Sequence, residues 1–414
     1  MLARLISSIL KRSLQPFVFV SGHPRESAVD IQNLGLYVHI PFCATLCPFC
    51  PYFKEQYNPK LVAPFVSALK QEIRIVGAQS GYPTVSSVYY GGGTPYLLKE
   101  RLSEIQNEIN TSFTVDGPCG IELHPDDIHP DTSLELLDTG FNMVSIGMQS
   151  FQSHCLRSLG RRPEDLSDRI LMMRDSGFAV IDVDLIFGLQ GQSAKDIQQD
   201  FRIAASHGAT QISTYPFIDF SFARNLRKPV GARRKRELLN AILEVSQEVG
   251  FGRTSVWTFA RNSSGRYSSV TRDSYLGFGP SAASLLRSSF SVNVFSVSEY
   301  IRAITQGQSP TALLVELTER ERALFWLFWN SYNLKIERDV FARRFGDTIE
   351  DVFGMELRFA RRLGITERRN NSYMITRKGA YPFHLVEQMY TNQYIDKVWR
   401  LSRRTPWPDK LVIH

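Results

Sequence analysis

The sequence predicts an α/β fold in which a partial TIM-type barrel of six βα units precedes a helical C-terminal module. Two observations lead to this prediction. Between residues 36 and 217, short β-type runs alternate with longer helical stretches, a pattern that implies a parallel sheet with helices outside. From residue 317 the texture changes to aromatic-rich helices and a hairpin. Six units fall short of the eight of a full barrel, so the barrel is expected to be incomplete.

The expected strands of the barrel are short and apolar, at residues 36–40, 85–90, 120–124, 143–148, 179–186 and 211–217. The helices expected between them lie at residues 60–76, 98–109, 133–139, 163–176 and 195–206. A basic connecting stretch follows at residues 219–236, with further β-type runs at residues 254–259 and 290–295. These runs predict a connecting α/β extension beyond the barrel.

The C-terminal part is expected to form a winged-helix-like α+β module. Its expected helices lie at residues 318–329, 336–344 and 349–363, and its hairpin strands near residues 365–368 and 373–376, before a last helix. Winged helices often bind DNA, but the third helix shows no base-reading pattern. We therefore expect an accessory or substrate-covering role and no nucleic-acid partner. The expected domains are an N-terminal helix or extension (1–33), the barrel (34–220), the extension (221–310) and the winged-helix-like domain (311–414).

Composition sets broad limits. The 414 residues are 43% hydrophobic, enough to bury a large core, and the net charge of +7 suits anionic partners without selecting one. Basic residues and leucines at helical spacing near the N-terminus predict a helix docked on the body, with a membrane-surface helix or a targeting peptide as alternatives. No apolar run approaches the roughly 20 residues of a membrane span. We expect a cytoplasmic protein, either free or peripheral to a membrane through that helix.

Three of the five cysteines lie within eight residues, directly after the first expected strand. Cys43, Cys47 and Cys50 form the pattern C-x-x-x-C-x-x-C. An odd count with such clustering indicates metal ligation in a reducing compartment rather than disulfides. Iron–sulfur clusters are usually held by four thiolates, so three leave one iron open to an exchangeable ligand. The alternative, a zinc site, needs four closed ligands, and no second cysteine pair is visible.

Polar and glycine-rich signals fall at the ends of the following strands, where a (βα) barrel carries its chemistry. The second strand ends in a run of three glycines, which lets the backbone approach a ligand closely. Arg161 offers a guanidinium that suits a carboxylate. Asp182 and Asp184 alternate onto the same side of the fifth strand. Cys119 and Cys155 lie outside the motif, and we interpret both as buried small residues.

The cysteine loop, with its preceding signature His39-Ile-Pro-Phe-Cys43, resembles that of radical S-adenosylmethionine (SAM) enzymes. The resemblance is to the branch around oxygen-independent coproporphyrinogen III oxidase. It covers about residues 35 to 300 and continues more faintly into the C-terminal module. It implies a 4Fe-4S cluster on Cys43, Cys47 and Cys50, and one or two molecules of SAM. For His39 itself, a core histidine and a direct role are both open.

The resemblance also implies roles for other residues. Those expected to bind the cofactor are Tyr37, Phe49, Gly92, Gly93, Thr94, Glu122, Gln149, Arg161, Asp184 and Ile186. The glycine stretch meets the SAM amino group, Glu122 pairs with the ammonium or ribose, and Asp184 bonds the ribose hydroxyls. Arg161 meets the carboxylate, although its neighbour Arg162 leaves that assignment open by one residue. Tyr37, near the sulfonium, and Tyr52 are the candidate catalytic residues.

Three activities within the resemblance remain open. Coproporphyrinogen oxidases carry a further cysteine where this chain has Tyr52, which counts against decarboxylation. Haem-chaperone relatives carry a His-Asn-x-x-Tyr-Trp motif, and the comparable residues 260–267 lack its histidine and tryptophan. We therefore favour a class C methyltransferase, or a relative that makes cyclopropanes or opens tetrapyrroles. Its substrate would be planar and hydrophobic, such as a quinone or tetrapyrrole, and its electron donor a flavodoxin or ferredoxin. A winged-helix nucleic-acid binder with a vestigial barrel is the alternative from another class.

Overall fold

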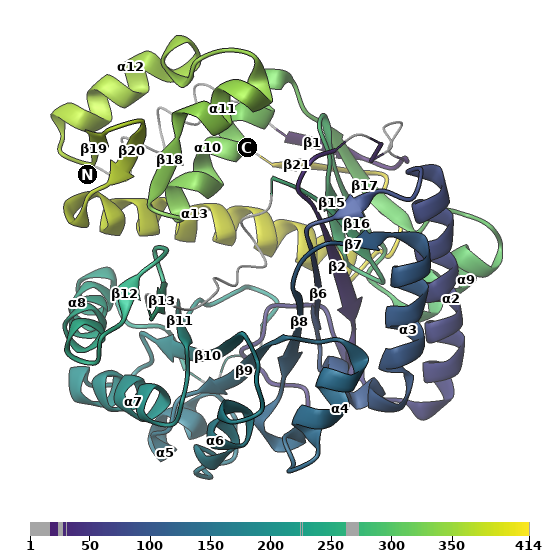
Figure 1. The fold of residues 1–414 in the computed structure, drawn as a ribbon, viewed down its shortest axis with the longest axis horizontal. Helices are drawn as coiled ribbons and strands as arrows, with labels where there is room; N and C mark the ends of the chain where they lie inside the picture. The colour runs from purple at the N-terminus through teal and green to yellow at the C-terminus, as the bar shows by residue number, and fades with distance from the viewer. Residues whose placement is uncertain are drawn as a thin grey trace.

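The computed structural model describes residues 17–23, 28–29, 31–223, 225, 227–261 and 273–413. It has the α/β architecture that the sequence predicts (Figure 1). The expected N-terminal helix falls on residues 1–16 and so lies outside the described residues. Residues Phe17–Val20, which we had placed in the same extension, form strand β1. Within the described ranges, every helix is too short or too polar to cross a membrane.

Six parallel strands form the partial barrel, as predicted. They are β2 (Leu34–Ile40), β6 (Ser87–Gly92), β8 (Cys119–Leu123), β9 (Met143–Gln149), β10 (Val180–Phe187) and β11 (Gln211–Pro216). They pair side by side in chain order, all in parallel. The helices that cover them are α2 (Pro59–Gln79), α3 (Lys99–Ser112), α4 (Thr132–Thr139), α5 (Ser153–Ser158), α6 (Asp168–Arg174) and α7 (Ala194–Ser206).

Local sequence signals explain where these helices begin. The Asn58 side chain caps α2 by accepting the N–H of Lys60, and a proline occupies the first turn. Ser193 and Asp196 form a reciprocal capping box at α7. The helix predicted at residues 163–176 is wrong at its start, and only α6 is helical. The Asp165 side chain accepts the N–H of Ser167 at 3.0 Å, a local turn that competes with the helix. We had not anticipated α5.

The sheet continues beyond the barrel on both sides. Next to β2 lies β14 (Ser274–Phe278), followed by β15 (Ala283–Leu285), β16 (Ser289–Asn293), β17 (Thr311–Glu316), β1 and β21 (Lys410–Ile413). The other edge carries β13 (Thr258–Ala260) and β12 (Gly252–Arg253). This single sheet therefore draws strands from all four expected segments. The strand predicted at residues 254–259 begins only at Thr258, because the Ser255 hydroxyl accepts the Thr258 N–H in a turn.

Helices and short pairings complete the body of the fold. Helix α8 (Ala232–Glu248) packs on α7, and α9 (Val297–Thr305) packs on α2. The two-stranded pairings are β3 (Phe42–Cys43) with β4 (Glu55–Gln56), and β5 (Thr84–Val85) with β7 (Thr114–Val115).

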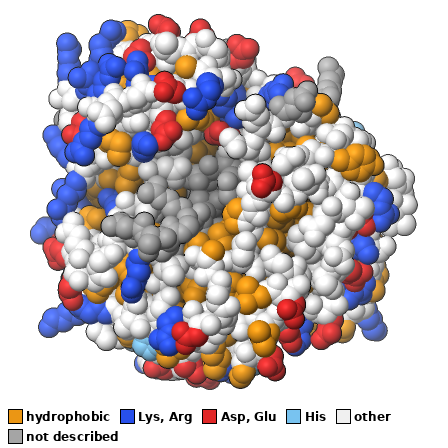
Figure 2. All heavy atoms as spheres, in the orientation of Figure 1, with side chains coloured by type: hydrophobic (Ala, Val, Ile, Leu, Met, Phe, Trp, Pro, Cys, Tyr) orange, Lys and Arg blue, Asp and Glu red, His pale blue; other side chains and the backbone are white. Residues whose placement is uncertain are grey.

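The C-terminal module has the predicted winged-helix-like order. Helices α10 (Glu319–Tyr332), α11 (Arg338–Phe345) and α12 (Ile349–Arg362) precede the hairpin of β19 (Thr366–Arg369) and β20 (Ser372–Ile375). A further strand that we did not predict, β18 (Lys335–Glu337), lies between α10 and α11 and pairs with β20. A separate core holds the module together around the rings of Trp326, Phe341 and Phe353. Lys and Arg side chains gather along the edge of the molecule that this module forms (Figure 2). Helix α13 (Arg377–Ser402) runs from the module back across the barrel (Figure 1).

Candidate functional site

The cysteine loop has a fixed base and an exposed tip. Strand β3 pairs in parallel with β4, which ties the two ends of the loop together. At the base, Phe42 is fully buried, and its ring meets Phe65 of α2 edge-on with ring centres 5.2 Å apart. Between these anchors, Cys43 is buried, whereas Cys47 and Cys50 are partly exposed. The thiols therefore lie near solvent on a short loop of fixed origin.

Polar and cationic groups surround the three thiols. The Thr94 hydroxyl donates to Cys43 Sγ at 3.7 Å, and Arg161 Nε donates to Cys47 Sγ at 3.2 Å. Lys54 Nζ donates to the carbonyl oxygen of Cys50 at 2.8 Å. Burial raises the pKa of Cys43 to about 11, and the Thr94 hydrogen bond acts against this rise. Cations at this position favour the thiolate forms that bind metal.

The donor set fits an iron–sulfur cluster with one open iron. Of the other cysteines, Cys119 is buried against Gln106, and Cys155 lies beside His154 on α5, so the loop alone supplies three thiols. In the part of the chain that the structure describes, no three His, Cys, Asp or Glu side chains converge closely enough to hold a metal ion. To bind one cluster, the three thiols of the loop must therefore move closer together.

The glycine turn after β6 is packed tightly against this loop. A Cβ on Gly93 would lie 2.5 Å from the carbonyl oxygen of Phe42, and one on Gly92 would lie 2.8 Å from the His39 ring. Gly92 also has a φ of +118°, which L side chains rarely adopt. Thr94 donates its N–H to Phe42 O at 2.7 Å. The structure thus brings all three predicted residues of the turn to the cysteine loop.

Tyr37 and His39 link the floor of the barrel to the loop. The Tyr37 hydroxyl lies 3.1 Å from His39 Nδ1, and His39 Nε2 lies 2.9 Å from the carbonyl oxygen of Phe53. Burial lowers the pKa of His39 to about 4, so its ring is neutral. A neutral ring that donates to Phe53 from Nε2 accepts from Tyr37 at Nδ1. His39 is therefore a core histidine whose two ring nitrogens both have partners.

Glu122 lies at the end of β8 and faces the barrel interior. It accepts the Tyr89 hydroxyl at 3.1 Å and the N–H of Gly92 at 3.2 Å. Burial raises its pKa, and these two hydrogen bonds act in the opposite direction. Glu122 thereby ties the glycine turn to the wall of the barrel.

Asp182 and Asp184 share one side of β10, as their alternation predicts. Asp184 accepts the Ser145 hydroxyl at 3.0 Å, and Asp182 accepts Gln211 Nε2 and the Ser213 hydroxyl, each at 2.8 Å. Burial raises the pKa of Asp182 to about 6. Burial also raises the pKa of Asp184 well above its usual value, and the charges of Asp182 and Glu122 add to this rise. Among the described residues, no Lys, Arg or His forms an ion pair with any of these three acids.

An apolar cluster lies beside the loop tip. Ile186 belongs to it, and Phe49 packs against it from the loop; the other members are Cys155, Leu159, Leu189 and Phe217. The Arg161 guanidinium lies 5.7 Å above the Phe49 ring, and Arg161 Nη1 donates to the carbonyl oxygen of Gly147. Arg162 instead pairs with Asp126 on the surface at 2.6 Å. The structure therefore brings Arg161, and not Arg162, to the predicted site.

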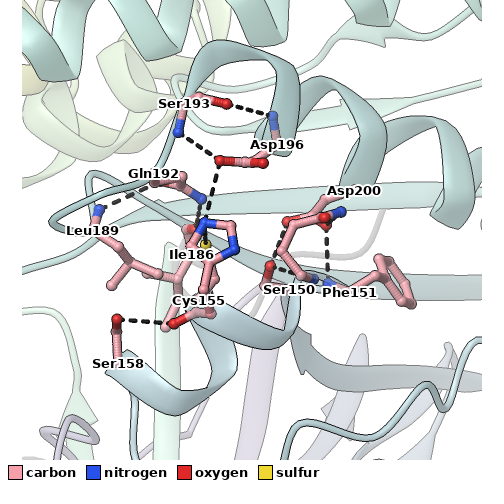
Figure 3. A network of polar contacts seen from close by, with 12 residues as sticks. Ser150, Phe151, Cys155, Ser158, Ile186, Leu189, Gln192, Ser193, Asp196 and Asp200 are labelled. Atoms are coloured by element: carbon pink, nitrogen blue, oxygen red, sulfur yellow. Dashed lines mark hydrogen bonds and ion pairs between the residues drawn. The ribbon is translucent and has the colours of Figure 1, made fainter.

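A polar network that we did not predict fixes the ends of β9 and β10 (Figure 3). Asp200 of α7 accepts the Ser150 hydroxyl at 2.6 Å and the Phe151 N–H at 2.9 Å. The Gln192 side chain accepts the Gly188 N–H at 2.8 Å and donates to Ile186 O at 3.1 Å. Asp200 was detectable as an acid within the buried stripe of an amphipathic helix. Gln149, just before this network, ends β9 with a φ of 69°.

A cavity of about 210 Å³ lies inside the barrel behind the cysteine loop. Aromatic and imidazole side chains dominate its walls, and Glu122 is its one carboxylate. The ring-bearing lining residues are Tyr37, His39, Tyr52, Phe53, Tyr89, Tyr275, Trp329 and Trp399. Trp329 comes from α10 and Trp399 from α13, so the C-terminal helices close one side of the cavity. Sequence alone did not place Trp399 or Tyr275 there, because neither belongs to a local motif.

Comparison with known proteins identifies relatives of this chain. A family model described as the radical SAM superfamily matches residues 37–204. The heme chaperone HemW of Bacillus subtilis is 26% identical over 361 residues, spanning 83% of this chain and 95% of the relative. An oxygen-independent coproporphyrinogen III oxidase of Synechocystis is 26% identical over 320 residues, or 69% and 68% of the two chains. The coproporphyrinogen III oxidase (HemN) of Escherichia coli shares the fold, with a TM-score of 0.77, 20% identity, and coverage of 94% and 98%.

Proposed function

From the premise that this chain belongs to the radical SAM superfamily, in the branch of coproporphyrinogen III oxidase, we propose that it cleaves SAM reductively at a 4Fe-4S cluster. Cys43, Cys47 and Cys50 would hold the cluster. The cluster, when bound, supplies the electron that cleaves the sulfonium and leaves a carbon radical. The electron itself would come from a flavodoxin or ferredoxin.

The distribution of charge carries this proposal. SAM bears a sulfonium, an ammonium and a carboxylate, together with a ribose diol and an adenine ring. Glu122 and Asp184 offer acceptors that no described cation occupies, and such acceptors suit the ammonium and the diol. Arg161 offers a guanidinium to the carboxylate beside Cys47. The apolar cluster of Ile186 and Phe49 offers a surface to the adenine.

The chain's own residues would also shape the reaction. Tyr37 and Tyr52 line the cavity between the cysteine loop and the C-terminal helices. Burial raises the pKa of the Tyr37 phenol, so it stays protonated and can donate a hydrogen bond to a bound ligand. The Tyr52 side chain is half exposed and reaches the cavity from the loop. The aromatic walls would exclude water from a radical formed beside them.

The ligand that we propose for the cavity is a tetrapyrrole or another planar aromatic compound. The aromatic lining offers stacking surfaces to part of such a ring, and the names of the two curated relatives refer to heme and to coproporphyrinogen III. Methyl transfer, the reaction that we favoured from sequence, finds no support among these relatives. This chain has Tyr52 where the oxidases carry a further cysteine. We therefore do not extend the proposal to decarboxylation, the reaction of the oxidases.

A second candidate function is that of a haem chaperone. The alignment with the Bacillus subtilis heme chaperone spans 95% of that protein, including its C-terminal part. A chaperone would hold haem against the aromatic cavity and release it to an acceptor protein. Of residues 260–267, which correspond to the histidine motif of such relatives, residues 262–267 lie outside the described residues.

Anaerobic reconstitution with iron and sulfide, followed by dithionite and methyl-labelled SAM, tests the proposal. Mass spectrometry would follow 5′-deoxyadenosine and S-adenosylhomocysteine, with haem, coproporphyrinogen and menaquinone as trial ligands. We expect 5′-deoxyadenosine from the wild-type chain and none from Cys47→Ala. Tight haem binding without either product would favour the chaperone instead. Label entering a substrate would restore methyl transfer.

A further inference from the structure

The last turns of α13 contact two separate loops at the mouth of the barrel. Asp396 accepts the N–H of Ser221 at 2.6 Å and its hydroxyl at 2.7 Å, in the loop that follows β11. About two turns further on, at the C-cap of the helix, Arg403 Nη2 donates to the carbonyl oxygens of Tyr52 at 3.0 Å and of Pro51 at 3.3 Å. These two carbonyls directly follow Cys50. The end of α13 is therefore hydrogen-bonded to the cysteine loop itself.

Aromatic contacts hold this end of the helix in place. The Arg403 guanidinium lies 4.7 Å above the ring of Phe222. The Trp399 ring meets Phe295 edge-on at 5.1 Å, and Phe295 in turn meets Phe53 at 5.5 Å. The carbonyl oxygen of Phe53 in turn accepts a hydrogen bond from His39 Nε2. Arg403 thus contacts the loop directly, while Trp399 contacts it indirectly, through Phe295 and Phe53.

Helix docking alone would not require a cation at this point. Near its N-terminal end, α13 is fixed without unpaired charge, because Trp257 Nε1 donates to the buried His384 at 2.6 Å. Arg403, by contrast, makes no ion pair with any described acid, and its hydrogen bonds go to the carbonyl oxygens of the two residues that follow Cys50. Arg403 is itself exposed, and what distinguishes it from other surface arginines is its pair of hydrogen bonds to the backbone that directly follows Cys50.

We propose that Arg403 is a positioning residue for the cluster, through which α13 orders the cysteine loop and sets the potential at which the cluster is reduced. This inference rests on the proposed function, since it presupposes a cluster on Cys43, Cys47 and Cys50. Two hydrogen bonds to the backbone after Cys50 restrict the loop that must gather its thiols. The positive charge opposes the extra negative charge of the reduced cluster and so raises its midpoint potential. The C-terminal module thereby takes part in cofactor assembly although it supplies no ligand.

The test compares Arg403→Ala and Arg403→Lys with Arg404→Ala, an exposed neighbour on the same helix end. Asp396→Ala provides a second route, because it releases the helix while keeping the cation. Two readouts are measured on the full chain. Hydrogen–deuterium exchange of residues 44–53 in the cluster-free protein reports loop order. A redox titration followed by electron paramagnetic resonance reports the midpoint potential of the reconstituted protein.

We expect Arg403→Ala to raise exchange in residues 44–53 by about tenfold, as the loss of charge-assisted hydrogen bonds implies, and to lower the midpoint potential. Arg403→Lys should recover the midpoint potential but only part of the protection from hydrogen exchange. Lysine keeps the positive charge but lacks the planar guanidinium that donates several hydrogen bonds at once. Asp396→Ala should loosen the loop, and Arg404→Ala should match the wild type. Unchanged exchange and potential in Arg403→Ala would overturn the inference, as would equal effects in Arg404→Ala.

The two proposals fail in different ways. A wild-type chain that takes up no iron and sulfide would refute the proposed function, whereas exchange in the cluster-free protein would still show whether Arg403 orders the loop. If the cluster forms normally and its midpoint potential is the same in Arg403→Ala as in the wild type, the proposed function stands and the inference is refuted. If Arg403→Ala fails to fold, Arg403→Lys and Asp396→Ala decide the same question.

Discussion

The cysteine loop and the barrel interior differ in the sign of the charge that each gathers. Lys54, Arg161 and Arg403 surround the loop, and none of them forms an ion pair with a described acid. Inside the barrel, Glu122, Asp182 and Asp184 share one wall, and none pairs with a described cation.

This difference in charge indicates which ligands the two parts of the site would bind. Placing unpaired charge in a buried site costs free energy, so a protein keeps it where a ligand supplies the opposite charge. A cluster with three thiolates is anionic and would satisfy the cations around the loop. The sulfonium and ammonium of SAM are cationic and would satisfy the acids. The acids, which are buried or partly buried, therefore favour a cationic ligand, and the cations around the partly exposed loop suit an anionic one.

The largest effect is expected from the loss of a thiol in the cysteine loop, which would prevent cluster binding. We expect Cys47→Ala to abolish cluster assembly, because two thiolates on a short loop cannot replace three. Iron and sulfide content and the charge-transfer absorbance measure the loss. Cys119→Ala, which removes a buried thiol remote from the loop, is the matched control and should keep the cluster. A Cys47→Ala protein with full absorbance would refute the ligand assignment.

Loss of an acid inside the barrel is expected to weaken SAM binding without affecting the cluster. We expect Asp184→Ala or Glu122→Ala to keep the cluster and to weaken SAM binding by about a hundredfold, since each removes a charged hydrogen bond of up to about 3 kcal/mol. Equilibrium dialysis of the reconstituted protein gives the affinity. Asp175→Ala, which removes an exposed carboxylate paired with Arg174, should leave the affinity unchanged. Equal SAM affinity in all three variants would show that these acids do not bind SAM.

The acids also predict the pH dependence of SAM binding. Burial raises the pKa of Glu122 and that of Asp184, so both lose charge at a higher pH than free carboxyls do. SAM binds the ionised forms, so affinity should fall as the pH falls, beginning above the usual range of a free carboxyl, by about tenfold per unit for one linked proton. Dialysis between about pH 8 and pH 5 measures this slope. An affinity that is flat over this range contradicts the role of the acids.

The smallest effect is expected at the aromatic wall. Trp329→Ala should weaken haem binding by about fivefold, because an aromatic contact is worth about 1 kcal/mol beyond its buried area. Absorbance titration with haem measures the affinity. Trp407→Ala is the control, because Trp407 donates to Glu299 and does not line the cavity. Equal loss in both variants would mean that the cavity does not hold the planar ligand.

Sequence predicted the barrel because its signals are local. Each strand from β2 to β11 is a short apolar run followed by a helix, and residues such as Gly93 and Asp184 end those runs in a readable order. The cysteine spacing is local in the same way. For these elements, adjacency in sequence and adjacency in the parallel sheet coincide.

Other parts of the site depend on contacts between segments that are distant in sequence. Arg403 meets Tyr52 across 351 positions, and no periodicity within α13 distinguishes it from Arg404. Strands β1 and β21 pair at the far edge of the sheet although they come from opposite ends of the chain. The unpredicted Asp200 could have been noticed, since an acid in a buried helical stripe needs a partner. Its partner, the backbone after β9, became visible only in the fold.

The most direct test of the two-sided site is the electron paramagnetic resonance spectrum of the reduced cluster, recorded with and without SAM. If the loop holds a cluster with an open iron and the acids hold SAM beside it, SAM will change the spectrum of the wild-type protein. Asp184→Ala will then need a much higher SAM concentration for the same change. A wild-type spectrum that SAM leaves unaltered would contradict the account, because the two halves of the site would then not share a ligand.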